Sequence, residues 1–239
     1  MSNRAGEPGA NGPSRTLLIP LVGPMQAWGS RSRFENRDTH PEPTKSGVVG
    51  LLCAALGRGR GERLDDLTAL RFGVRADKPG RVLADYHTAQ ASIKDKQAAQ
   101  STREYLADAR FLVGLESSDL AFLRVLETAL QNPVWTLSLG RKSFPLTLPP
   151  FLPAACDGSI RAGKDLETAL REEPWRRFFV KEEPDSALRL LVEAADGEAA
   201  FADEPLHFGE RRFGLRRVRV TTIAGSSLPI KEHPCFFPV

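Results

Sequence analysis

The order in which strand-like and helix-like segments follow one another limits the fold of this sequence more than any other feature. Residues 15–23, RTLLIPLVG, form an apolar run typical of a largely buried strand. Helices are predicted over about 44–57 and, from its 3.6-residue apolar spacing, over 119–132 with Asp119 as N-cap. Further strands are indicated between and after them, at 71–77, 81–88, 103–116, 187–194 and 211–224. This order predicts an α+β fold built on an antiparallel sheet.

Two segments interrupt that pattern. Residues 64–70, LDDLTAL, could supply a second short helix. Residues 88–103 are polar, with Lys94, Asp95 and Lys96 among several Gln and Ala residues. We interpret 88–103 as an excursion from the sheet rather than a part of the core.

The composition is that of an ordinary soluble globular chain, with 41% hydrophobic and 26% charged residues among 239. No apolar run approaches the length of a membrane span, and the first 15 residues are polar and rich in Gly and Pro, so we expect a cytoplasmic protein without a membrane partner. Cys53, Cys156 and Cys235 are widely separated and lack CxxC spacing. Neither disulfides nor a metal site is therefore expected, and no cofactor is indicated. Cys53, on an apolar helical face, is interpreted as a core residue.

Charge is unevenly distributed along the chain. Residues 165–204 contain five Lys/Arg and twelve Asp/Glu, whereas residues 205–239 contain six and two. Arg217 and Arg219 would share one strand face and form a cationic stripe. This segregation is compatible with one surface facing a polyanion and another facing solvent or a protein partner. The alternative is that each charge run is simply a solvated face.

The stretch PTKSGVVGLLCAALG, residues 43–57, is the first candidate anion site. Pro43 and the hydroxyls of Thr44 and Ser46 suit the start of a helix, where a side-chain oxygen caps exposed amides. The same amides, the helix dipole and the Lys45 ammonium would also suit a phosphate oxygen. Locally, capping alone is the commoner use of such residues, and the residues themselves leave both readings open.

The stretch LGRKSFPLTLPP, residues 139–150, is the second candidate. Gly140, Arg141, Lys142 and Ser143 offer backbone amides, two cations and a hydroxyl in one turn, which suits a phosphodiester. The alternative is a tight turn with solvated charges. The stretch GRGRG, residues 57–61, lacks the lysine and serine of a nucleotide-binding P-loop.

Tyr86 and His87, in DYHT, and Tyr105, in YLADA, form a possible catalytic set. Tyr, His and Lys side chains together can cleave RNA without a metal by general acid–base transfer. A Tyr next to a His at a strand end is more often an ordinary surface pair, so this pattern by itself is weak.

Five blocks in a fixed order carry a family resemblance: GPMQAWG, PTKSGVVGLL, DYHT, REYLADARFLV and LGRKSFPL. Together they resemble the CasD family of subunits of the type I-E CRISPR interference complex, Cascade, within the RAMP superfamily. The resemblance is dense over residues 16–153 and looser in the C-terminal third. The tail before Ser14 looks like an extension, and residues 157–205 contain no clear matching block.

The resemblance implies a ferredoxin-like RAMP domain over residues 15–156 with a protruding thumb near 88–103. It also implies a flexible N-terminal extension, 1–14, and a C-terminal part, 157–239, that adds strands and packs on the same domain. Such a subunit holds the 5′ handle of the guide RNA and caps one end of the complex, with its thumb displacing a nucleotide at the handle–spacer junction. The implied partners are the guide RNA, the backbone subunit CasC, the large subunit CasA and, through guide pairing, the target DNA.

The resemblance also assigns RNA-binding residues. Thr44, Lys45 and Ser46 would both cap their helix and face the handle, next to a turn in which Gln26 contacts a base edge or phosphate and Trp28 packs or stacks. The remaining expected contacts come from the 139–150 turn, the thumb base and the DYHT block, and the full set is Met25, Gln26, Trp28, Thr44, Lys45, Ser46, Tyr86, His87, Arg103, Tyr105, Gly140, Arg141, Lys142 and Ser143.

Three functions follow from these patterns. The favoured one is a non-catalytic RNA-binding subunit, because the blocks resemble the type I-E form, in which a separate CasE subunit cuts the guide precursor. The alternative is a metal-independent endoribonuclease that processes the repeat RNA, as the equivalent type I-C subunit does, with Tyr86 and His87 as the pair to test. A protein-only scaffold is disfavoured by the basic segments.

Overall fold

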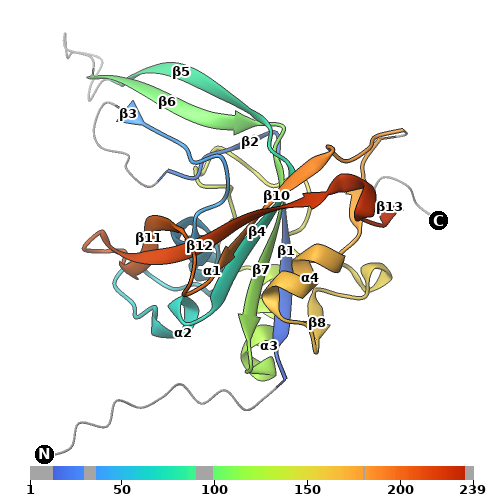
Figure 1. Ribbon diagram of the computed structural model, residues 1–239. Coiled ribbons are helices and arrows are strands. Elements are labelled where there is room, and N and C mark those ends of the chain that lie inside the picture. The colour runs from blue at the N-terminus through green and yellow to red at the C-terminus, as the bar shows by residue number, and fades with distance from the viewer. Residues whose placement is uncertain (1–12, 30–35, 90–98, 180, 235–239) are drawn as a thin grey trace, which may run out of the picture.

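The computed structural model describes residues 13–29, 36–89, 99–179 and 181–234 (Figure 1). Its main element is a seven-stranded antiparallel sheet. The strands lie in the order β11 (Ala199–His207), β12 (Arg212–Ala224), β10 (Ala187–Glu193), β4 (Arg71–Lys78), β7 (Arg110–Ser117), β1 (Arg15–Val22) and β8 (Ile160–Ala162). The expected α+β class is confirmed.

One half of this sheet has the ferredoxin-like arrangement. Its strands lie in the order β8, β1, β7, β4, and the chain visits them as β1, α1 (Lys45–Leu56), β4, β7, α3 (Leu120–Gln131) and β8. This is a β-α-β-β-α-β unit. Strands β10, β12 and β11 extend the sheet beyond β4, as the sequence predicted for the segments 187–194 and 211–224.

Both faces of the sheet are covered, which explains why β1 is almost continuously apolar. Leu17, Ile19 and Leu21 point to the core that contains α1 and α3, whereas Leu18 points to a second core that contains α4 (Leu166–Glu172). Leu18 enters a different core from its neighbours Leu17 and Ile19, because successive side chains of a strand face opposite sides of the sheet.

The predicted helix ends are confirmed. Thr44 caps α1 by accepting a hydrogen bond from Gly47 N at 3.2 Å, and Asp119 caps α3 by accepting one from Phe122 N at 3.0 Å. The second short helix is α2 (Asp65–Thr68). Cys53 lies in the core, where burial raises the pKa of its thiol to about 11.

The prediction of one strand over 103–116 is wrong. The chain forms β6 (Ala99–Ala107) and then β7, with a turn at Asp108, whose φ is +56°. Asp tolerates this left-handed conformation better than most residues, and Asp108 N donates to the Pro24 carbonyl at 3.1 Å. The alternating pattern continues across the break, so periodicity alone could not reveal it.

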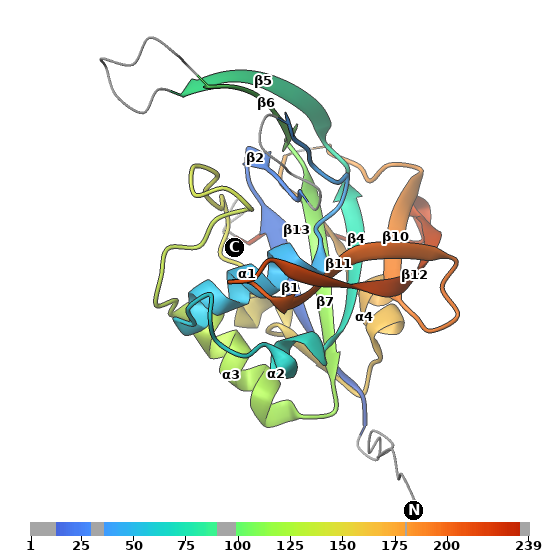
Figure 2. The same cartoon turned by 90° about the vertical axis from the view of Figure 1, so that its left-hand side faces the viewer.

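A hairpin of β5 (Arg81–Ala89) and β6 projects from the main sheet (Figures 1 and 2). It is longer than the predicted excursion, because it starts at residue 81 rather than 88, and residues 90–98 lie outside the described part of the chain. Two short strands join it on the other side of β6: β2 (Met25–Gln26), which is antiparallel, and β3 (Asn36–Arg37), which is parallel.

The remaining elements belong to the C-terminal third. They are a pair of parallel strands, β9 (Trp175–Arg177) and β13 (Ile230–Glu232), and two short 3₁₀ turns at Ala154–Cys156 and Gly225–Ser227. The expected N-terminal extension lies almost wholly outside the described residues, which begin at Pro13. Among the helices that are described, none is both long and apolar enough to cross a membrane.

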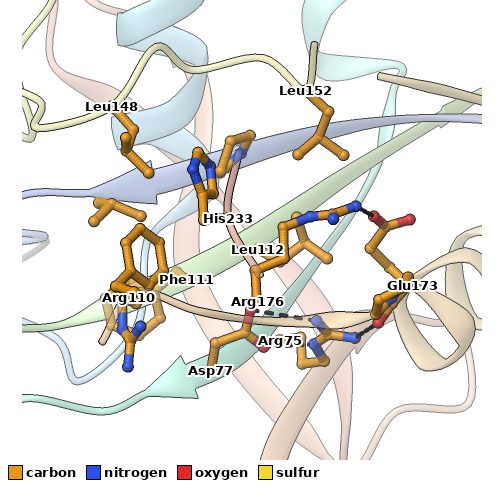
Figure 3. Close-up of a pocket in the computed structure, with 14 residues that line it drawn as sticks. Arg75, Asp77, Arg110, Phe111, Leu112, Leu148, Leu152, Glu173, Arg176 and His233 are labelled. Atoms are coloured by element: carbon orange, nitrogen blue, oxygen red, sulfur yellow. Dashed lines mark hydrogen bonds and ion pairs between the residues drawn. The ribbon is translucent and has the colours of Figure 1, made fainter. Parts of the chain in front are cut away.

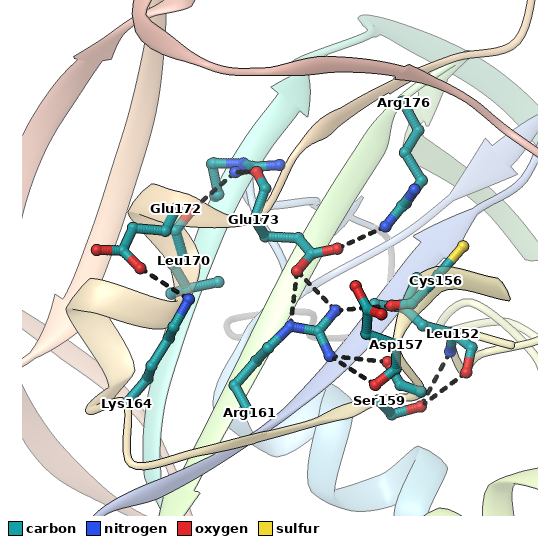
Figure 4. A network of polar contacts seen from close by, with 12 residues as sticks. Leu152, Cys156, Asp157, Ser159, Arg161, Lys164, Leu170, Glu172, Glu173 and Arg176 are labelled. Carbon is teal, nitrogen blue, oxygen red and sulfur yellow. Dashed lines mark hydrogen bonds and ion pairs between the residues drawn. The ribbon is translucent and has the colours of Figure 1, made fainter. Parts of the chain in front are cut away.

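The acidic segment 165–204 is largely neutralised within the chain. Glu173 accepts from Arg161 and Arg176 in a buried network (Figure 4), and Glu182 pairs with Arg110. Further carboxylates of the segment pair with Lys45, Lys164, Arg171, Arg216 and Arg219. The local charge excess therefore reflects intramolecular pairing more than an open acidic surface.

Candidate nucleic-acid interface

The N-terminus of α1 is closed by carboxylates from the C-terminal strands. The Lys45 side chain is 1% exposed, and its Nζ lies 3.0 Å from Glu193 Oε2 and 2.8 Å from the Thr68 carbonyl. The Lys45 backbone N–H donates to Asp203 Oδ2 at 2.8 Å. Asp203 in turn accepts two hydrogen bonds from the buried Arg216, at 2.6 and 2.8 Å.

The predicted phosphate-binding role of this helix start is therefore corrected. Asp203 occupies the position that an anion would take at the first helical amide, and the Lys45 ammonium is satisfied internally. Thr44 is 2% exposed, and Ser46 donates to its hydroxyl at 3.4 Å. What is confirmed is the helix cap, not the anion site.

The turn that precedes this helix is also structural. Gln26 is fully buried, and its side-chain amide donates to the carbonyls of Leu21 and Ala109 at 3.2 and 2.8 Å. Its Oε1 accepts from the indole of Trp28, which is 1% exposed. Trp28 packs against Gly47, as expected from the packing of β1 and α1. The expected RNA contact of Gln26 is thus corrected to a core hydrogen-bond network. Met25, half-buried in β2, pairs with Ala107 of β6.

The loop 139–144 is docked on this same turn. Ala27 N donates to the Leu139 carbonyl at 3.0 Å. Gly140 has φ +90°, and a Cβ there would lie 1.8 Å from the Ala27 carbonyl oxygen, so no other residue fits. The loop leaves Lys142 and Ser143 exposed and Arg141 half-buried. The four residues Gly140 to Ser143 thus lie in one turn, as the sequence predicted. Gly140 allows the backbone of this loop to approach that of Ala27 closely.

Arg141 brings this loop to the base of the hairpin. Its Nη2 donates to the Glu104 carbonyl at 2.9 Å and to the Arg37 carbonyl at 3.5 Å, and its guanidinium lies 5.5 Å from the centre of the Phe144 ring. Burial, followed by repulsion from Arg103 and Arg37, lowers the pKa of Arg141. Because arginine stays protonated at neutral pH, the three cations repel one another at this place.

We call Arg37, Arg103 and Arg141 the arginine cluster. The parallel pairing of β3 with β6 places Arg37 beside Arg103, and no carboxylate among the described residues lies within ion-pair distance of any of the three. Asp85 lies opposite Arg103 in the register, and its charge acts on Arg141. Arg37 is not among the residues predicted from the sequence, because only the long-range pairing of β3 with β6 brings it here.

The hairpin has two chemically different faces. Cross-strand partners share a face, so His87 and Ser101, Asp85 and Arg103, and Leu83 and Tyr105 point to one side. This side faces the loop 139–144, since the Tyr105 and Phe144 rings lie 5.7 Å apart. Among the described residues of the other face, Glu104 is the sole charged one; its remaining members are Val82, Ala84, Tyr86, Thr88, Gln100, Thr102 and Leu106.

Tyr86 and His87 consequently point to opposite faces of β5, because they are neighbours on a strand. Tyr86 is 63% exposed, whereas His87 is half-buried and its Nδ1 has no hydrogen-bond partner among the described residues. The two side chains therefore do not converge on one point, as a general acid–base pair would. Over the described ranges, no group of three or more His, Cys, Asp or Glu residues could hold a metal ion.

A separate small cavity lies on the opposite side of the sheet, around Arg75 and His233 (Figure 3). Arg75 is fully buried but donates to Asp77 and to the carbonyls of Leu170 and Glu173, so its charge is satisfied. Burial and Arg176 lower the pKa of His233 to about 4, so the imidazole is neutral there. These contacts hold the C-terminal segment against the sheet, so we assign the residues around this cavity a structural role.

Comparison with known proteins places this geometry in a family. Residues 16–219 match the family model described as CRISPR-associated protein (Cas_Cas5), and the chain belongs to this Cas5 family. It is 35% identical over 223 residues to the CRISPR system Cascade subunit CasD of Escherichia coli (strain K12), covering 84% of this chain and 92% of that protein. The predicted resemblance to CasD is confirmed.

Two solved structures agree with this assignment. One, described as the crystal structure of a Cas protein, has 44% identity and a TM-score of 0.71, covering 90% of this chain and 97% of the other. A chain of a CRISPR RNA-guided surveillance complex has 30% identity and a TM-score of 0.71, covering 92% and 95%.

Proposed function

We propose that this chain is a non-catalytic RNA-binding subunit of a Cascade-type CRISPR interference complex, where it holds the 5′ handle of the guide RNA and caps the backbone filament. The observation that carries the proposal is the arginine cluster. Three arginines converge at the base of a projecting hairpin, none of them with an ion-pair partner among the described residues, and a phosphodiester would relieve their repulsion.

The groups around the cluster suit an unpaired RNA strand. Lys142 and Ser143 are exposed on the adjoining loop and can contact further phosphates. His87 and Tyr105 lie on the hairpin face that carries Arg103 and could meet a splayed base. Sequence-specific RNA recognition favours such unstacked bases, while phosphate contacts set the register.

The printed names of two relatives support the partners that we propose. CasD is named as a Cascade subunit, and a similar chain occurs in an RNA-guided surveillance complex. We expect this chain to meet the guide RNA, a CasC-type backbone subunit and a CasA-type large subunit. Target DNA would be reached indirectly, through pairing with the guide.

The test is an incubation of the purified chain with labelled repeat RNA in EDTA, read on native and denaturing gels. We expect a salt-sensitive shift with intact RNA. The double variant Arg103→Ala/Arg141→Ala should bind about 10–100-fold more weakly, with a salt slope reduced by about 1.4, because two phosphate contacts are lost. Arg63→Ala is the matched control, since this arginine is 91% exposed and pairs with Asp65 far from the hairpin.

Two results would reject the proposal. Equal RNA affinity of the double variant and the wild type would show that the arginine cluster does not hold RNA. Discrete cleavage that disappears in His87→Ala would instead identify a metal-independent processing endoribonuclease.

A further inference from the structure

The segment 131–136, QNPVWT, forms an exposed surface without a charged residue. Val134 is 64% and Trp135 is 49% exposed, and Val125, on α3 just before the segment, is 53% exposed. Figure 2 shows α3 beside α1, with the loop that follows α3 on the same side of the molecule. We call Val134 and Trp135, with the rest of 131–136, the tryptophan surface.

The backbone of this surface is held rigidly by α1. Val134 N and Trp135 N donate to the carbonyls of Ala55 and Ala54 at 3.0 and 3.1 Å. Val134 packs on Gly57, where a Cβ would lie 2.9 Å from Val134 Cγ1. The loop thus caps the C-terminus of α1, and its exposed side chains are pre-organised rather than mobile, which lowers the entropic cost of binding.

Trp135 differs from the other two tryptophans. Trp28 and Trp175 are 1% exposed and donate their indole N–H groups to Gln26 Oε1 and the Asp77 carbonyl. Within the described ranges, no acceptor takes the N–H of the Trp135 indole. A rigid, half-exposed indole with a free donor is typical of an anchor residue in a protein interface.

The chemistry of this surface favours a protein over a nucleic acid. Phosphate binding needs cations, and 131–136 contains none. The nearby Arg58 is already paired with Asp66, with Nη1 to Oδ1 at 2.7 Å. Depletion of charge around an aromatic anchor is the compositional signature of an interface core.

The size of the surface argues against a dimer of this chain. A stable dimer buries about 800 Å² on each partner, whereas an aromatic side chain supplies about 150–250 Å² even when it is wholly exposed beforehand. Two or three partly exposed side chains are one anchor within a larger assembly, which suits a family whose members include a Cascade subunit.

We propose that Trp135 anchors a docking face for another protein subunit of the Cascade-type complex, which presents an apolar pocket for the indole and an acceptor for its N–H. This proposal rests on family membership and not on the RNA-binding role. Trp135 precedes Arg141 by six residues in the sequence, so the loop that carries the docking face continues into the arginine cluster.

The first test is competition during assembly. Wild-type chain and Trp135→Ala are co-expressed at equal levels with the other complex subunits and guide, and their ratio in the purified complex is measured by mass spectrometry. We expect about tenfold enrichment of the wild type, the usual effect of losing an interface anchor. Leu215→Ala is the control, because Leu215 is 72% exposed on β12, and it should be incorporated equally. Equal incorporation of Trp135→Ala would overturn the proposal.

The second test identifies what covers the indole. The chain is labelled with 5-hydroxytryptophan and quenched with acrylamide, which reaches Trp135 but not the two buried tryptophans. We expect protection only when the protein subunits are assembled. Protection by handle RNA alone would mean a base-stacking site, and protection that rises with the concentration of the isolated chain would mean self-association; either result overturns the proposal. Unchanged RNA affinity of Trp135→Ala separates this outcome from the test of the arginine cluster.

Discussion

The N-terminus of α1 and the base of the β5–β6 hairpin use similar chemical groups and end in opposite states. At α1, the Lys45 ammonium and the first helical amide are both satisfied by carboxylates of β10 and β11. At the hairpin, Arg37, Arg103 and Arg141 repel one another, and within the described ranges no carboxylate pairs with any of them. The comparison teaches that a cation beside a hydroxyl is a binding group only where the fold leaves it without an internal counterion.

The largest expected effect tests the internal charge pairing at the N-terminus of α1. Asp203→Ala would leave the Arg216 guanidinium buried without its partner and the Lys45 amide without an acceptor, so we expect a loss of about 3–5 kcal/mol in the free energy of unfolding. Urea denaturation measures it. Asp196→Ala is the control, because its pair with Arg219 is exposed and screened by solvent, so this substitution should leave the free energy of unfolding almost unchanged. Similar losses in both variants would show that burial does not distinguish them.

The next effect tests how the loop 139–144 is held. Gly140→Ala would place a methyl group 1.8 Å from the Ala27 carbonyl oxygen, at a φ of +90°, so the loop must move. We expect a loss of about 2–4 kcal/mol in stability and weaker RNA binding, because Arg141 moves with the loop. Thermal unfolding and a gel shift measure the two effects. Gly61→Ala, where a Cβ meets nothing within 4 Å, should change neither.

A smaller effect tests how much each residue of the arginine cluster contributes to RNA binding. Single substitutions Arg37→Ala, Arg103→Ala and Arg141→Ala should each weaken RNA binding about threefold to tenfold and reduce the salt slope by about 0.7. Fluorescence anisotropy at several salt concentrations measures both quantities. An Arg37→Ala variant with wild-type affinity would remove this residue from the cluster.

The smallest expected effect tests most directly whether the N-terminus of α1 differs from the arginine cluster in binding RNA. Lys45→Met should leave RNA affinity within about twofold of the wild type when measured at a temperature at which the variant is folded, since an ammonium that is 1% exposed contacts no phosphate. Circular dichroism establishes that temperature, and anisotropy measures the affinity. A loss as large as that of Arg141→Ala would mean that α1 opens toward RNA.

Much of the fold could be predicted because its signals are local. The apolar run of β1, the spacing of α3 and the caps at Thr44 and Asp119 depend on neighbours in the sequence. The break between β6 and β7 could not be predicted, because the alternating pattern stays in phase across Asp108. Within 157–205 the strand β10 was predicted, whereas β8, α4 and β9 were not, because elements of three to seven residues are too short to show a clear periodic pattern.

For the candidate site, too, local features could be predicted and long-range contacts could not. By itself, the sequence determined the order of elements, the family and the grouping of Gly140 to Ser143 in one exposed turn. Only the tertiary structure decided which charges are available. Asp203 reaches Lys45 across 158 positions, and the parallel pairing of β3 with β6 sets Arg37 beside Arg103. The physical reason is that neutralisation depends on which side chains meet in space, and a charge pattern along the chain does not contain that distance.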